Sequence, residues 1–152
     1  NQKTISGKTI PPTAQDVERA VKTALSTADC NEGEIAFFGG SFTAIDRKYM
    51  IQLLEAAKEY VDRALFRGIR ISTRPDCINE DILDNLKKYG IGTIELGVQS
   101  MCNDVLLANN RGHNAEDVIN AVNLIRKYDF SLDVKLKNYI IIILLKIMVL
   151  SY

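Results

Sequence analysis

The sequence has 152 residues, 47% of them hydrophobic and 25% charged, which is enough for one globular domain with a hydrophobic core. Its 19 basic and 19 acidic residues cancel, which excludes nucleic-acid binding through net charge alone. The three cysteines, Cys30, Cys77 and Cys102, are widely spaced and favour neither a disulfide framework nor a zinc pair. We therefore expect reduced thiols and a cytoplasmic location.

The spacing of apolar residues predicts helices and strands in alternation along the chain. Helices are expected over residues 14–26, 46–63, 79–89, 101–110 and 115–128. Strands, which are short apolar runs that end at glycine, proline or polar residues, are expected over residues 35–38, 69–73, 93–98 and 131–136. Each strand–helix–strand unit is long enough for a crossover, so the sequence predicts a parallel α/β sheet or barrel. In such folds the ligand lies beyond the carboxyl ends of the strands.

Capping residues and apolar faces add detail to these elements. Thr13 with Asp16 forms a capping-box pattern before the first helix, and Asn79 and Asn114 are expected caps of two later helices. The strand over residues 35–38 is expected to be buried. The first helix is expected to bury Val17, Ala20, Val21, Ala24 and Leu25.

The last residues, 137–152, differ from the rest of the chain. They are strongly apolar, show no helical or strand period, and are interrupted by Lys146 in a run too short for a confident membrane span. We expect an atypical tail outside the domain and hypothesise that a shifted reading frame in AT-rich DNA encodes it. The alternative is an apolar helix or strand packed on the domain. Sequencing the locus tests the hypothesis, which an intact frame through Tyr152 would contradict.

Small or charged residues follow the first two expected strands. Gly39 and Gly40 would let the backbone approach a ligand closely, although a plain tight turn is the favoured explanation of the pair taken alone. Arg74, in the segment STRPD, has the planar guanidinium that suits a carboxylate or phosphate. A surface salt bridge is the alternative for Arg74.

The third expected strand and the loop that follows it carry further candidates. Alternation places Glu95, Gly97 and Gln99 on one face, where a buried Glu95 must be paired or functional and Gln99 is the better ligand candidate. In the segment NNRGHN, His113 follows Arg111 and is expected to cap the next helix or to form a loop hydrogen bond rather than to act in catalysis. The single histidine, without Ser–His–Asp or HExxH spacing, disfavours a hydrolase. No phosphate-binding P-loop and no GxGxxG motif occurs.

Four segments in order, FFGGSFTAI, ISTRPD, ELGVQSM and NRGH, resemble the radical S-adenosylmethionine superfamily. They are most similar to the branch related to the Elongator catalytic subunit and to oxygen-independent coproporphyrinogen III oxidase, over about residues 1–132. The resemblance implies an α/β fold, a partial TIM-type (β/α)6 barrel truncated at both ends. It makes residues 1–136 a partial core domain of this superfamily, followed by the tail over residues 137–152.

The resemblance also implies the cofactors and the chemistry. In similar proteins three cysteines bind a [4Fe–4S] cluster, and one electron from it cleaves S-adenosylmethionine to a 5′-deoxyadenosyl radical that abstracts hydrogen from a substrate. An electron donor such as ferredoxin or flavodoxin, and a tRNA or small-molecule substrate, are implied for the full-length parent. No membrane partner is implied.

Cofactor-binding residues follow from the resemblance by position. Gly39, Gly40 and Ser41 correspond to the motif whose backbone meets the methionyl amino group. Gln99 corresponds to the residue that reaches the ribose, and Arg111 to the residue that pairs with the methionyl carboxylate.

Two further residues, Thr73 and Arg74, fall where the superfamily has cofactor-contacting side chains. The coproporphyrinogen branch has glutamate where this chain has Ser72, so that contact is expected to differ. The three cysteines do not match the cluster positions, and Asn1–Gln2 corresponds to the pair that directly follows the last cluster cysteine. We therefore assign no catalytic or metal-binding residue and expect the chain alone to be inactive.

Two alternatives stay open. The chain is either part of an enzyme of another barrel class that binds a phosphorylated metabolite through Arg74 and Arg111, or a non-catalytic remnant or interaction module. Binding of phosphate esters without iron favours the first, and failure to bind S-adenosylmethionine favours the second.

Overall fold

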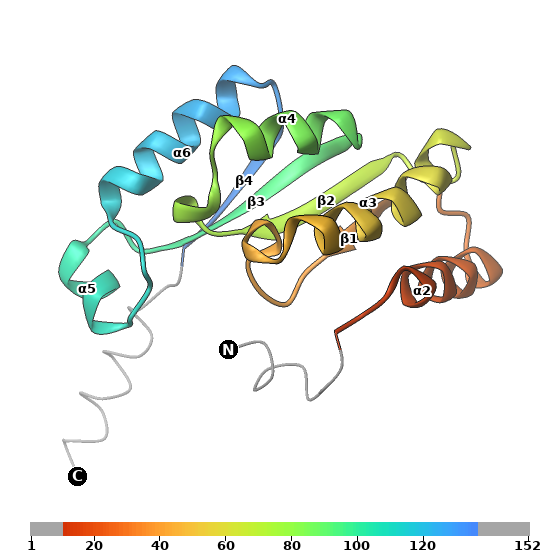
Figure 1. The fold of residues 1–152 in the computed structure, drawn as a ribbon, viewed down its shortest axis with the longest axis horizontal. Coiled ribbons are helices and arrows are strands. Elements are labelled where there is room, and N and C mark those ends of the chain that lie inside the picture. Colours follow the sequence, from red (N-terminus) through yellow and green to blue (C-terminus); the bar gives the residue numbers. More distant parts are fainter. Residues whose placement is uncertain (1–10, 137–152) are drawn as a thin grey trace, which may run out of the picture.

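The computed structural model describes residues 11–136 (Figure 1). The expectations for Asn1–Gln2 and for the tail over residues 137–152 lie outside the described residues. The strands are β1 (Glu34–Phe37), β2 (Gly68–Thr73), β3 (Ile91–Gln99) and β4 (Ser131–Leu136). The α-helices are α2 (Ala14–Thr27), α3 (Arg47–Asp62), α4 (Glu80–Lys88), α5 (Asn103–Ala108) and α6 (Ala115–Lys127). Two short 3₁₀ helices, η1 (Phe42–Ala44) and η2 (Pro75–Cys77), follow β1 and β2.

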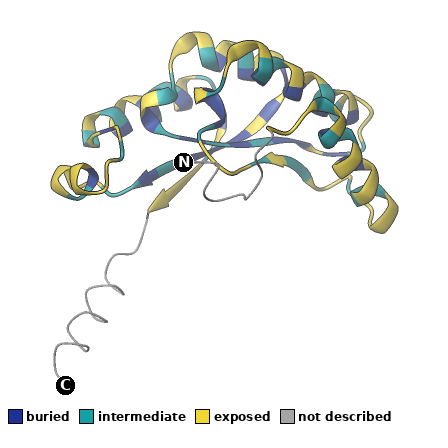
Figure 2. Ribbon diagram, turned by 60° about the horizontal axis from the view of Figure 1, so that its bottom comes forward, coloured by how far each residue is buried: buried dark blue, intermediate teal, exposed yellow. Residues whose placement is uncertain are grey.

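The four strands form one sheet in the order β1-β2-β3-β4, and every neighbouring pair is parallel. Helices α3, α4 and α6 connect successive strands and lie on one face of the sheet, and none of the described helices lies over the opposite face (Figure 2). The prediction of an α/β fold with a parallel sheet is therefore confirmed. Parallel strands aligned in this way bring all their carboxyl ends to one edge of the sheet.

The hydrophobic core lies between the sheet and its helices. Alternate residues of β2 and β3 point into it, because successive side chains of a strand point to opposite faces. Ile69, Ile71, Ile94, Leu96 and Val98 are completely buried there. Each such side chain contributes roughly 1.5–3 kcal/mol by leaving water, and together they fix which face of the sheet meets the helices.

The helix starts agree with the expected caps. Thr13 and Asp16 form a capping box at α2, Asn79 caps α4 through the Ile82 amide, and Asn114 caps α6. The helix expected over residues 101–110 is shorter, since only Asn103–Ala108 is helical. No helix within residues 11–136 is long and apolar enough to cross a membrane.

Two burial expectations were wrong. Ala20 is exposed, because α2 packs against α3 through a narrow stripe that includes Val17 and Val21. Strand β1 is only partly buried and Phe38 is 56% exposed, because within the described residues β1 has a partner strand on one side only.

The face of the sheet opposite the helices is polar and ion-paired. Glu34 accepts hydrogen bonds from Arg70 Nε at 2.9 Å and from Thr93 Oγ1 at 2.7 Å, and Arg70 also bonds to Asp133. Burial alone would raise the pKa of Glu34, but the hydrogen bonds from Thr93 and Arg70 and the nearby cations outweigh it and lower that pKa. This network joins residues of all four strands across the open face.

Glu95 lies on the same open face, nearly buried at 6% exposure. Its carboxylate is 2.7 Å from Lys135 Nζ on β4, so the expectation that Glu95 must be paired or functional is met by pairing. The Lys135 ammonium also lies 5.6 Å from the centre of the exposed Phe38 ring.

Candidate functional site

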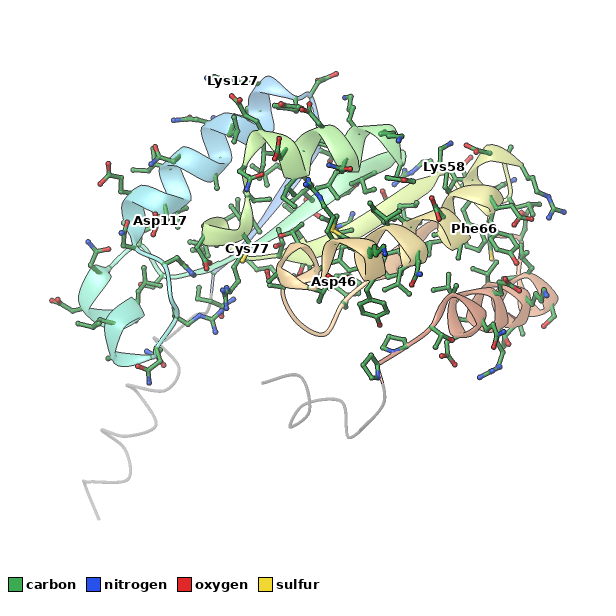
Figure 3. The ribbon with its side chains drawn as sticks, viewed as in Figure 1. Asp46, Lys58, Phe66, Cys77, Asp117 and Lys127 are labelled. Carbon is green, nitrogen blue, oxygen red and sulfur yellow. The ribbon has the colours of Figure 1, made fainter. Side chains whose placement is uncertain are left out.

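The loops that follow β1 and β2 and the loop that precedes α6 gather at the carboxyl edge of the sheet. Figure 3 shows Cys77 of η2 between Asp46, which caps α3, and Asp117 in the first turn of α6. Direct contacts agree with this view, because η2 packs against α6 and the Thr43 hydroxyl bonds to the Cys77 carbonyl at 2.7 Å. The loop after β1, η2 and the start of α6 are therefore adjacent.

The glycine loop after β1 begins with a backbone turn. Gly39 has a φ of 104°, in the region that side chains disfavour, and a Cβ built there would touch nothing within 4 Å. Both Gly39 and Gly40 are exposed. The loop thus presents bare backbone toward open space at the end of the strand, as a close approach to a ligand requires.

A line of hydroxyl groups holds this loop to β2. Ser41 Oγ lies 2.9 Å from Thr73 Oγ1, and Thr73 Oγ1 lies 2.5 Å from Thr43 Oγ1. The ends of the line fix its direction: Thr43 donates to the Cys77 carbonyl, so Thr73 must donate to Thr43 and Ser41 to Thr73. Ser41 then accepts from the Arg74 amide at 3.3 Å.

Because of these hydrogen bonds, the hydroxyl groups of two predicted site residues, Thr73 and Ser41, contact other protein groups and do not face a ligand. Thr73 is only 2% exposed, on the helix-facing side of β2, and both of its hydroxyl bonds are internal. The Ser41 hydroxyl is also used internally, which leaves the backbone of the loop as the part free to meet a ligand.

Arg74 forms a two-pronged ion pair with a neighbour. Its Nε and Nη2 donate to the two carboxylate oxygens of Asp76 at 3.0 and 2.7 Å. The hydrogen bonds to Asp76 raise the pKa of the Arg74 guanidinium despite partial burial, so it stays cationic. The side chain is 41% exposed, and the salt-bridge explanation of Arg74 agrees with this geometry.

Gln99 ends β3 in a strained conformation. Its φ is 68°, and the Ser100 amide bonds to the Val98 carbonyl at 2.8 Å, which makes Gln99 the centre of the rarer, strained form of γ-turn. The register with β4 also shifts between Leu96 and Gln99. Gly97, two residues earlier, packs closely against β2, since a Cβ built there would lie 3.4 Å from the Thr73 carbonyl oxygen. Strain of this kind at a strand end is typical of a functional position.

Arg111 lies in the loop between α5 and α6, beside a surface hollow lined by α5 and that loop. Its Nε is buried and has no hydrogen-bond partner, and Arg111 forms no ion pair within residues 11–136. Since buried donors are nearly always paired, the unpaired Nε makes Arg111 a candidate for contact with an anionic ligand.

His113, two residues further on, is buried at 7% exposure, and its Nε2 lies 3.1 Å from the Val98 carbonyl. The prediction that His113 forms a loop hydrogen bond is confirmed. The cap of α6 is Asn114, not His113.

Two residues of the site were not predicted. Thr43 is a buried member of the hydroxyl line, and Asp76 holds Arg74. A polar side chain in the apolar segment SFTAI and an acid two residues after an arginine were the available signals, but neither specifies a partner. In the part of the chain that the structure describes, no group of three histidine, cysteine, aspartate or glutamate residues is placed to hold a metal ion. The described residues therefore do not fit an iron–sulfur cluster.

The family model described as the radical SAM superfamily matches residues 2–146. Elongator complex protein 3 of Saccharomyces cerevisiae is 32% identical over 102 residues, which cover 56% of this chain and 18% of that protein. The tRNA uridine(34) acetyltransferase of Methanocaldococcus infernus is 32% identical over 110 residues, 61% of this chain and 21% of that protein.

A solved structure agrees with these relatives. The N-terminally deleted archaeal Elp3 of Methanocaldococcus infernus superposes with a TM-score of 0.64 at 27% identity, over 81% of this chain and 32% of that one. The chain spans about a fifth of the length of the curated relatives named above.

Proposed function

Because the chain belongs to the radical SAM superfamily and is similar to Elongator complex protein 3, we propose that the carboxyl edge of its sheet binds S-adenosylmethionine. The observation that carries the proposal is Arg111, whose buried Nε has no partner among the described residues. A guanidinium with an unpaired N–H donor can form an ion pair and hydrogen bonds with a carboxylate, and the methionyl end of S-adenosylmethionine carries a carboxylate.

The remaining proposed contacts come from the resemblance to the superfamily, and the geometry of the loops is compatible with them. The backbone of the exposed Gly39 and Gly40 and of the half-buried Ser41 would meet the methionyl amino group, where carbonyl oxygens accept hydrogen bonds from an ammonium. Gln99, held at the strand end by its γ-turn, would bond to the ribose hydroxyls. The glycine backbone, the side-chain amide of Gln99 on its strained backbone, and the Arg111 guanidinium with its unpaired Nε together offer acceptors and donors to both ends of one elongated ligand.

Thr73 and Arg74 have different proposed roles. Thr73 would act through the hydroxyl line, by holding the glycine loop in place. Arg74 would reach the cofactor only by leaving Asp76, with which it makes two hydrogen bonds. We therefore place Arg74 at the rim of the site.

The reaction of the full-length parent is also a proposal. A bound [4Fe–4S] cluster supplies, in this superfamily, the electron for cleavage of S-adenosylmethionine to a 5′-deoxyadenosyl radical. We propose that other cysteines of the full-length parent, not Cys30, Cys77 or Cys102, hold it, with ferredoxin or flavodoxin as electron donor. A relative named as a tRNA uridine(34) acetyltransferase supports tRNA as the substrate class. We also propose a cytoplasmic location, because the free thiols of Cys30, Cys77 and Cys102 suit a reducing compartment.

Equilibrium dialysis of the 152-residue chain against radiolabelled S-adenosylmethionine tests the proposal. Arg111→Gln removes the charge and should weaken binding at least about tenfold, since hydrogen bonds to charged groups contribute about 1.5–3 kcal/mol. Arg126→Gln is the matched control, because Arg126 is an exposed arginine in the last turn of α6. Equal binding by the wild type and Arg111→Gln, or no binding by the wild type, refutes the proposal.

The phosphate-ester alternative receives less support. It requires both Arg74 and Arg111 to face a ligand, but Arg74 is already paired with Asp76. Displacement of radiolabelled S-adenosylmethionine by ribose 5-phosphate, used as the probe, would reverse this preference.

A further inference from the structure

His113 is the only histidine of the sequence, and its side chain is completely buried. It contacts two other parts of the site. Its Nε2 lies 3.1 Å from the Val98 carbonyl on β3, and its Nδ1 lies 3.9 Å from Asp76 Oδ1 in η2. Since a carbonyl only accepts hydrogen bonds, Nε2 must carry a proton and donate it.

The Val98 carbonyl that receives this hydrogen bond also closes the γ-turn. It accepts from the Ser100 amide at 2.8 Å, and Gln99 stands between the two residues with its φ of 68°. A second donor on the same carbonyl anchors the turn from outside, because a carbonyl oxygen has two lone pairs. His113 therefore supports the one segment of β3 whose backbone is strained.

The other ring nitrogen argues against a role in packing alone. Nδ1 is buried and has no hydrogen-bond partner among residues 11–136, and the same is true of Nε of Arg111, two residues earlier. An apolar side chain of similar size would fill this space without burying an unpaired polar atom. What the imidazole provides, and an apolar residue cannot, is the donor that reaches the Val98 carbonyl.

We propose that His113 is a positioning residue for cofactor binding, an inference that rests on the proposed function. Its bond to the Val98 carbonyl holds the γ-turn that presents Gln99, and it ties the loop that carries Arg111 to the end of β3. One buried side chain thereby fixes the spacing between the residue proposed for the ribose and the residue proposed for the methionyl carboxylate. His113 itself touches neither end of the ligand.

Two substitutions separate this role from simple packing. His113→Gln keeps a side-chain amide that can donate to the Val98 carbonyl, whereas His113→Leu fills the space without a donor. Ile125→Val, at a completely buried position of α6, is the control for a mild loss of stability. If His113→Leu does not fold, His113→Asn replaces it, because its shorter amide cannot reach Val98.

The measurements are the dissociation constant for S-adenosylmethionine of the full chain and the backbone ¹⁵N–¹H resonance of Gln99 in the free protein. We expect His113→Leu to weaken binding about fivefold, the value of one neutral hydrogen bond, and to shift the Gln99 resonance. His113→Gln should restore both, and Ile125→Val should change neither.

Equal binding by the wild type and His113→Leu, or equal weakening by Leu and Gln, overturns the positioning role and leaves the proposed function standing. Absence of binding by the wild-type chain overturns both together.

Discussion

The hydroxyl line that joins Ser41, Thr73 and Thr43 allows a quantitative test of how the glycine loop is held. Thr73→Val keeps the shape of a side chain that is 2% exposed and removes its hydroxyl. Two hydrogen bonds disappear, at 2.9 Å to Ser41 and at 2.5 Å to Thr43. With about 1 kcal/mol for each neutral hydrogen bond, the free energy of unfolding should fall by about 2 kcal/mol.

Urea denaturation followed by far-UV circular dichroism measures this loss, since the chain contains no tryptophan to report by fluorescence. A double-mutant cycle with Ser41→Ala isolates one bond of the line. Because Thr73→Val leaves the Ser41 hydroxyl without its acceptor, the two costs should fail to add, with a coupling of about 1 kcal/mol. The assigned hydrogen bonds of Thr73 would be refuted if Thr73→Val lowered the free energy of unfolding by less than about 0.5 kcal/mol. They would also be refuted if the losses of the two single variants added strictly in the double variant.

Two further substitutions have distinct expected results. Gln99→Gly relieves the backbone strain of a φ of 68° and should raise the free energy of unfolding by about 1 kcal/mol. The same variant should bind S-adenosylmethionine more weakly, because it lacks the side-chain amide. A lower stability in urea denaturation would contradict the assigned strain. Glu34→Gln tests the open face: because the folded-state pKa of Glu34 is lowered, its contribution to stability is present above the unfolded value of 4.5 and is lost as pH falls through the folded value. The variant should therefore be less stable than the wild type at neutral pH and approach it in acid, and a stability difference that does not change with pH would count against the network around Glu34.

The elements of the fold could be predicted because local signals determine them. Thr13, Asn79 and Asn114 each cap the helix expected after them, and the alternation of Ile69 and Ile71 sets the buried face of β2. These features depend on neighbours within a few residues, so the sequence alone displays them.

Burial and side-chain partners could not be predicted in the same way. The exposure of Phe38 depends on which strand lies beside β1, and that of Ala20 depends on how α2 packs on α3. Thr43 and Thr73 meet across 30 positions of sequence, which no local pattern reveals. The position of Arg74 at a strand end can be predicted, but the sequence does not decide between a surface salt bridge and a ligand contact, and the structure pairs Arg74 with Asp76.

Binding of S-adenosylmethionine at the carboxyl edge of the sheet is tested most directly by ¹⁵N–¹H NMR titration of the 152-residue chain with the cofactor. We predict saturable shifts of the Gly39, Gly40 and Gln99 amides and of the Arg111 Nε–H signal, with the open-face residues Arg70 and Lys135 unchanged. Shifts confined to the open face, or no saturable shift at the carboxyl edge, would contradict this placement of the site.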